Sequence, residues 1–149
     1  MMPEVISALT DWSTAGAGGV LIGTAALSFH VRPRMAQELE FLVLDDAAIP
    51  GAVLGFDRIG PMLLRHCATG VEVNVVTPVA ISVPIEVAEE VARAAIVSDG
   101  VQVASESAIV MLKLFRQSRQ DEADIIALIK TGRVDLSRKL NIAKWLMQN

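Results

Sequence analysis

Short apolar runs alternate with amphipathic stretches along the chain, a pattern that predicts strands and helices in turn. Near the start, Val5, Ile6, Leu9 and Trp12 recur at helical spacing and predict one buried helix face. The predicted helices are 3–13, 24–30, 84–94, 106–116, 121–130 and 136–147, with a short one from 45 toward 54. The predicted strands are 20–22, 38–44, 62–67 and 71–76, with a hairpin over 95–103. This order favours an α/β (α+β) fold, in which helices flank a mixed β-sheet and a helical segment closes the chain.

Length and composition favour a single globular domain. The chain has 149 residues, of which 52% are hydrophobic and 20% charged, enough to build a core. We expect the core of this domain over about 1–104 and C-terminal helices over about 105–149. The net charge of −4 and the absence of tyrosine argue against general nucleic-acid binding. The apolar composition is compatible with a homodimer, but no segment of the sequence locates an interface.

Two features bear on where the protein resides. The uncharged segment 12–29 raises the question of a membrane span. Four glycines and four Ser or Thr residues interrupt it, and it lacks a cationic flank, so a buried strand followed by a helix explains it better. The single cysteine, Cys67, cannot form an internal disulfide. We therefore expect a cytoplasmic protein that does not enter the membrane.

A glycine turn followed by two acids is the feature that carries chemistry. Gly23 opens the predicted helix 24–30, and Glu38 and Glu40 stand two residues apart on the predicted strand 38–44. In a strand, residues i and i+2 point to the same side, so the two carboxylates can converge on one point. A glycine turn at a helix start offers backbone N–H groups to phosphates. The pattern predicts a site where the acids hold Mg²⁺ and the turn holds a triphosphate.

Segment 21–44, LIGTAALSFHVRPRMAQELEFLVL, resembles the signature of the nucleotidyltransferase superfamily, which has the DNA polymerase beta-like fold. That signature is a hydrophobic residue, Gly, then Gly or Ser, a spacer, and Asp-x-Asp/Glu. More closely, the segment is similar to the small bacterial AbiEii-like nucleotidyltransferases. Segment 70–78 (GVEVNVVTP) fits the family strand that holds a third acid, and 105–129 fits its Lys-Leu helix and the helix after it. The similarity spans most of the chain and depends on order and spacing.

The resemblance implies transfer of a nucleoside monophosphate from a magnesium-bound nucleoside triphosphate to an acceptor hydroxyl. It implies roles in catalysis for Glu38, Glu40 and Asn74, in Mg²⁺ binding for Glu38 and Glu40, and in nucleotide binding for Gly23, Thr24, Arg34 and Lys113. Such catalysis consists mostly of positioning and charge neutralisation.

Several positions depart from the family pattern. Glu38 replaces the first Asp, Asn74 replaces the third acid, Ala36 replaces the usual Thr, and Thr24 replaces Gly or Ser. Glu is longer than Asp by one methylene, and Mg²⁺ requires near-ideal octahedral geometry. Asn is neutral and cannot act as a general base. The sequence therefore leaves open a second class, a non-catalytic nucleotide- or protein-binding module that acts as an antitoxin-like or regulatory partner.

The residues of the turn and the acidic strand also have purely structural interpretations. Glu38 and Glu40 could be charges that protect an exposed strand from edge-to-edge pairing. Gly23 could serve packing where strand meets helix, and Thr24 could only cap the helix.

The remaining candidates have structural interpretations as well. Asn74 could be an amide that bonds backbone groups, and Lys113 could extend along the surface to reach solvent. Arg34 could bind phosphate or neutralise the acids. Glu72 shares the strand face of Asn74, but we expect that it reaches the acids only after a change of register. The two histidines, His30 and His66, lack ligand spacing for zinc, and no Ser-His-Asp arrangement emerges from the sequence.

Overall fold

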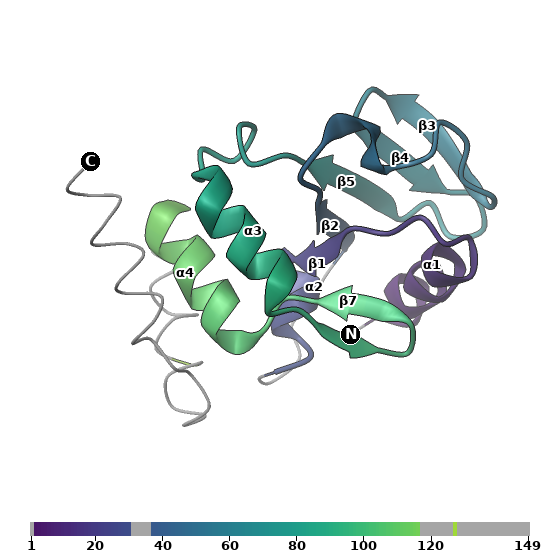
Figure 1. Cartoon of the computed structure of the whole chain (residues 1–149). Helices are drawn as coiled ribbons and strands as arrows, with labels where there is room; N and C mark the ends of the chain where they lie inside the picture. The colour runs from purple at the N-terminus through teal and green to yellow at the C-terminus, as the bar shows by residue number, and fades with distance from the viewer. Residues whose placement is uncertain (1, 31–36, 117–126, 128–149) are drawn as a thin grey trace.

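The computed structural model describes residues 2–30, 37–116 and 127. In these ranges the strands form one seven-stranded mixed sheet in the order β3-β4-β5-β2-β1-β7-β6 (Figure 1). The strands are β1 (Val20–Ile22), β2 (Glu38–Leu42), β3 (Phe56–Gly60), β4 (Leu63–His66), β5 (Glu72–Val76), β6 (Ile96–Ser98) and β7 (Val101–Val103). The helices are α1 (Pro3–Thr14), α2 (Gly23–Leu27), α3 (Ile85–Arg93) and α4 (Glu106–Arg116), with the 3₁₀ turn η1 (Asp46–Ala48). The predicted mixed α/β architecture is confirmed.

Parallel pairing occurs at two places in the sheet. β2 runs parallel to β5, and β1 runs parallel to β7, whereas β1 and β2 are antiparallel. Because side chains alternate along a strand, the β2–β5 register fixes which residues share a face. Leu39 and Phe41 lie beside Val73 and Val75, and all four are buried.

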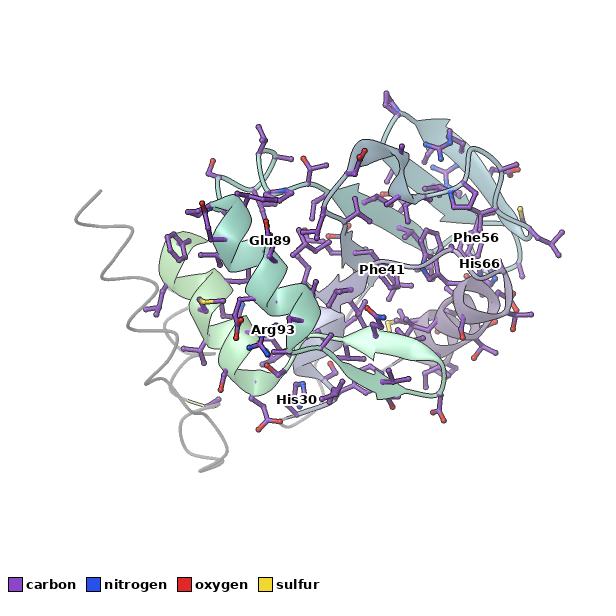
Figure 2. All side chains as sticks on the ribbon, viewed as in Figure 1. His30, Phe41, Phe56, His66, Glu89 and Arg93 are labelled. Atoms are coloured by element: carbon purple, nitrogen blue, oxygen red, sulfur yellow. The ribbon has the colours of Figure 1, made fainter. Side chains whose placement is uncertain are left out.

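Helix α1 covers the apolar face that contains Phe41. The Trp12 indole stacks on the Phe41 ring at a centroid distance of 4.9 Å and meets the Phe56 ring edge-on at 5.2 Å. The His66 ring lies 5.0 Å from Phe56, so one aromatic group joins α1 to β2, β3 and β4 (Figure 2). Aromatic pairs at these distances add to the stability gained from burial.

Helix α2 begins on the opposite face, where Gly23 meets the Glu40 side chain. It contacts β1, β2 and α4, and α3 packs beside α4 (Figure 1). Val87 and Val91 of α3 and Ala108 and Met111 of α4 are buried. The two helices therefore form a second part of the core.

His30 connects the end of α2 to the start of α4. Its Nε2 atom lies 2.8 Å from the Ala104 carbonyl oxygen, and its Nδ1 atom lies 2.8 Å from Oε1 of Glu106. Ser105 caps α4, because its hydroxyl oxygen accepts a hydrogen bond from the Ala108 N–H.

Several boundaries differ from those predicted. The helix predicted over 24–30 is the five-residue α2, and the helix predicted from 45 toward 54 is the single turn η1, capped by Asp45. β3 was not predicted, because Asp57 and Arg58 interrupt its apolar pattern. The predicted helices 121–130 and 136–147 lie outside the described residues.

The uncharged segment 12–29 spans the end of α1, a glycine-rich link, β1 and α2, as the strand-and-helix interpretation expects. Within the described ranges, no helix is both long enough and apolar enough to cross a bilayer.

Candidate functional site

Five residues on one face of the central strands form what we call the acidic corner: Gly23, Glu38, Glu40, Glu72 and Asn74. In the parallel β2–β5 pair, Glu38 lies opposite Glu72 and Glu40 lies opposite Asn74. These four residues alternate with buried apolar ones, so their side chains share the face away from α1. The spacing of the two strands places four oxygen-bearing side chains in one small area.

Gly23 meets Glu40 at the end of β1. Its φ of +73° is left-handed, a conformation that glycine adopts without strain. A Cβ atom at this position would lie 3.4 Å from Oε1 of Glu40. Ile22, the residue before Gly23, is the cross-strand partner of Glu40. The structure therefore brings the second acid of the sequence pattern directly to its glycine.

Glu38 is paired with an amide. The Asn74 Nδ2 atom donates a hydrogen bond of 3.3 Å to Oε2 of Glu38. Glu38 is exposed and Asn74 half-buried, so the bond lies at the surface of the site. A carboxylate at position 74 would repel Glu38 at this distance, whereas the amide satisfies one of its lone pairs.

The prediction that Glu72 needs a change of register is wrong. Glu72 is the cross-strand partner of Glu38 and faces the same side without any shift. Its Oε1 atom lies 3.5 Å from Nη2 of Arg65 on β4, and both side chains are about half exposed. Such an exposed pair contributes little to stability, but it sets one positive charge beside the acids.

The other predicted nucleotide-binding residues surround the corner or fall outside the described ranges. Thr24 is exposed on the first turn of α2, next to Gly23. Because α2 has only five residues, its dipole adds little to anion binding. Lys113 is half-buried on α4, a helix that contacts α2. Arg34 lies outside the described residues.

The chemistry of the acidic corner suits a hard cation. Two carboxylates and an amide oxygen are the ligands that Mg²⁺ prefers, and Glu38, Glu40 and Asn74 supply them. Among the described residues, no group of three or more His, Cys, Asp or Glu side chains has metal-holding geometry.

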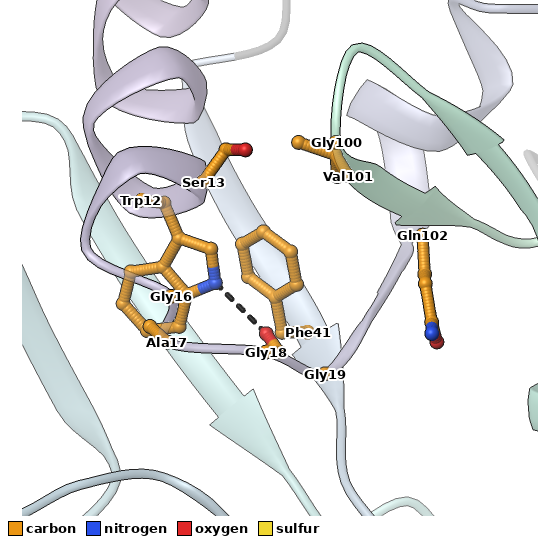
Figure 3. Close-up of a pocket in the computed structure, with 10 residues that line it drawn as sticks. All are labelled: Trp12, Ser13, Gly16, Ala17, Gly18, Gly19, Phe41, Gly100, Val101 and Gln102. Carbon is orange, nitrogen blue, oxygen red and sulfur yellow. Dashed lines mark hydrogen bonds between the residues drawn. The ribbon is translucent and has the colours of Figure 1, made fainter.

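A separate cavity of about 200 Å³ lies at the other end of β1 (Figure 3). The glycine-rich link 15–19 forms one wall, where the Trp12 indole N–H donates a 2.9 Å hydrogen bond to the Gly18 carbonyl. Gly16 and Gly18 have φ values of +67° and +83°, yet a Cβ atom on either would meet nothing within 4 Å. The left-handed turn itself therefore accounts for these two glycines.

A buried histidine chain was missed by the sequence reasoning. The His66 Nε2 atom lies 2.6 Å from Oδ2 of Asp11, and its Nδ1 atom lies 2.7 Å from the Thr69 hydroxyl. The Thr69 oxygen also accepts a bond from the Val71 N–H and closes the turn after β4. His66 and Thr69 share one turn, but Asp11 lies 55 residues earlier on α1, so no local sequence motif could have found the chain. Their contacts tie α1 to this turn.

No family model matches the chain, and no curated protein matches it.

Proposed function

We propose that this chain is a nucleotidyltransferase-like protein. It binds a nucleoside triphosphate with Mg²⁺ at the acidic corner and transfers a nucleoside monophosphate to an acceptor hydroxyl, at a rate lowered by its non-standard acids. One observation carries the proposal. Oε1 of Glu40 lies 3.4 Å from the Cβ position of Gly23, so a carboxylate and a side-chain-free backbone turn meet at one point. A site for a magnesium-bound polyphosphate needs both features. The carboxylate binds the metal ion, and the backbone N–H groups bind the phosphates at close range.

Each residue of the corner has a role in this proposal. Glu38 and Glu40 would hold Mg²⁺, which supplies neutralisation of the phosphate charge when it is bound. The phosphates would lie against the backbone of the Gly23 turn, beside Glu40, and the exposed Thr24 hydroxyl can donate to one of them. Lys113 and Arg34 would add positive charge. In the reaction the acceptor oxygen bonds to the α-phosphorus, the bond from that phosphorus to the bridging oxygen breaks, and pyrophosphate leaves.

Removal of the proton from the acceptor hydroxyl is one step that the non-standard acids slow. A carboxylate at position 74 could accept that proton, but Asn74 cannot, so the proton has to pass to water. The longer Glu38 side chain also shifts the first carboxylate relative to an Asp. A displacement of ~1 Å at a reacting centre can cost on the order of 100-fold in rate.

A second function, a non-catalytic nucleotide- or protein-binding module, is favoured by the Asn74–Glu38 hydrogen bond. The amide already satisfies one oxygen of Glu38, at 3.3 Å, without a metal ion. In that case the protein would act as an antitoxin-like or regulatory partner, and the corner would bind a nucleotide without turning it over.

The experiment combines a thermal-shift screen with a transfer assay. The four ribonucleoside triphosphates are added with and without Mg²⁺, and transfer of α-labelled monophosphate to RNA, to a small hydroxyl acceptor and to the protein itself is followed. We expect a Mg²⁺-dependent rise in melting temperature for at least one nucleotide, because a ligand of the native state stabilises it by mass action. Glu40→Gln should abolish this rise, whereas Glu4→Gln, an exposed acid on α1, should leave it unchanged.

The transfer assay separates the two functions. Slow transfer that Glu40→Gln removes supports the enzyme, and a nucleotide-dependent melting shift without transfer supports the binding module. If no nucleotide shifts the melting temperature with Mg²⁺ present, nucleotide binding at the acidic corner is refuted.

A further inference from the structure

The two edges of the sheet differ in how they are protected. At the β3 edge, Asp57 and Arg58 are charged and exposed, and the register with β4 shifts between Arg58 and Gly60. The Arg58 guanidinium donates hydrogen bonds to the carbonyl oxygens of Pro50, Gly51 and Pro61. Charges and irregularities of this kind prevent an edge strand from pairing with another chain.

The β6 edge has none of these devices. Its three residues, Ile96, Val97 and Ser98, include no charge and no proline. Ile96 is 45% exposed and Val97 is 71% exposed. Among the described strands β6 pairs with β7 alone, so the hairpin forms one margin of the sheet (Figure 1). The short length of β6 limits such pairing, but an exposed apolar edge without charges still offers its backbone groups to a further strand.

The hairpin turn determines which backbone groups of β6 point outward. Asp99 and Gly100 have φ values of +50° and +81°, typical of a two-residue hairpin turn. Ser98 and Val101 close this turn, so the next pair, Val97 and Gln102, is the pair that does not exchange hydrogen bonds. The N–H and C=O of Val97 therefore point away from β7, toward the open edge.

An apolar groove continues from this edge across the face that α1 covers. A cavity of about 320 Å³ lies between α1, the end of α2 and the hairpin, and its walls include Ile6, Leu9, Phe29 and Val101. Ile6 is 50% exposed and Phe29 is 38% exposed. Through the paired strands, Ile96 shares this face with Val103, Leu21 and Phe41. The groove and the Ile96 side of the strand edge together form one largely apolar surface, whose walls also include Thr10, Ser28, Ser98 and Asp99.

We propose that a second copy of this chain covers this surface by antiparallel pairing of β6 with β6 about a two-fold axis at Val97. The outward N–H and C=O of each Val97 then bond to those of the partner's Val97, and Ile96 lies beside the partner's Ser98. Because the axis is perpendicular to the joined sheet, both α1 helices lie on the same face, and the Ile6 and Phe29 surfaces of the two copies come together.

The area needed by a stable dimer supports a folded second copy over a short peptide. A standard interface buries ~800 Å² per partner, far more than a three-residue strand can provide. The groove has to be covered as well, and an identical copy brings a matching apolar surface of its own. The strand edge also carries no charge that would meet itself across the axis.

The test is sedimentation-equilibrium or light-scattering mass over protein concentrations from about 1 to about 100 µM. We expect the wild-type mass to rise from 15.9 kDa toward twice that value. Val97→Lys should raise the dimer dissociation constant at least ten-fold, because it places two lysines directly opposite each other across the axis. Val79→Lys is the matched control, since Val79 is 88% exposed and lies away from the β6 edge, and it should leave the mass unchanged.

Circular dichroism melting of the Val97→Lys variant checks that it is folded. Two results would overturn the proposal. One is a wild-type mass of 15.9 kDa at every concentration, which would leave the β6 edge to another kind of partner. The other is a dimer that persists unchanged in the folded Val97→Lys variant. Neither result bears on nucleotide binding, because the acidic corner lies on other strands.

Discussion

At the scale of single residues, Cys67 shows how a neighbour tunes reactivity. The thiol is exposed just after β4, beside Asp57 of β3. Desolvation first, and then the charge and hydrogen bond of Asp57, raise the pKa of Cys67 above its usual value.

Asp57→Asn should lower the pKa of Cys67, because a negative neighbour disfavours the thiolate. The rate of alkylation by iodoacetamide against pH measures it, and Glu86→Gln is a control on the distant α3. An unchanged pH profile would contradict this account.

Residue by residue, the candidate site was only partly predictable. The convergence of Glu40 on Gly23 follows from local rules, the alternation of strand side chains and the freedom of glycine at a turn. The pairing of Asn74 with Glu38 and the alignment of Glu72 could not be predicted. Both depend on the register of two strands that lie more than thirty residues apart in the sequence, and no local pattern specifies that register.

At the scale of elements, α1 and the β6–β7 hairpin meet at one close contact. Gly100 has a φ of +81°, and a Cβ atom there would lie 2.6 Å from the Ser13 hydroxyl oxygen. Gly100→Ala should cost about 1–2 kcal/mol for the left-handed backbone, and a smaller amount for turning the Ser13 hydroxyl away from the new methyl group. Adding Ser13→Ala to this variant should remove the clash and restore that part of the stability, but not the part lost to the left-handed backbone. Urea unfolding measures both.

Gly51→Ala is the matched control, because Gly51 has no left-handed φ and nothing lies within 4 Å of its Cβ position. Its free energy of unfolding should change by less than about 0.5 kcal/mol. If Ser13→Ala restored the Gly100→Ala variant completely, the backbone term would be absent and the prediction wrong.

Most described elements were predictable because their apolar periodicity is strong. The helices α1, α3 and α4 and the strands β1, β2, β4 and β5 lie within a few residues of their predicted positions. β3 lacks such a pattern. Its position depends instead on the Arg58 hydrogen bonds to a neighbouring loop and on pairing with β4. Such tertiary contacts are invisible in a local window of sequence.

At the scale of the whole molecule, the net charge is −4. Part of the repulsion between acidic side chains lies at the acidic corner, where three glutamates share one face of the sheet. Asn74→Asp would place a third acid where an amide now donates to Glu38 at 3.3 Å. The melting temperature should fall by roughly 2–4 °C, corresponding to about 1 kcal/mol at this half-buried position. The loss should shrink in high salt, which screens surface charges, and Mg²⁺ should reverse it more than Na⁺ of equal ionic strength.

Gln102→Glu, at an exposed position on β7, adds the same charge away from the corner and serves as the control. It should show no special response to Mg²⁺. Equal responses of both variants to Mg²⁺ would mean that the cation acts by general screening and does not bind at the corner.

The parallel pairing of β1 with β7 has a consequence for synthesis on the ribosome. Strand β1 (20–22) can pair with its second neighbouring strand, β7, only after residues 101–103 have been synthesised. While the chain is being translated, β1 therefore keeps an unpaired side next to its completed pairing with β2. A nascent chain stalled before residue 101 should expose that side to chaperones, and release of the last third of the domain should hide it.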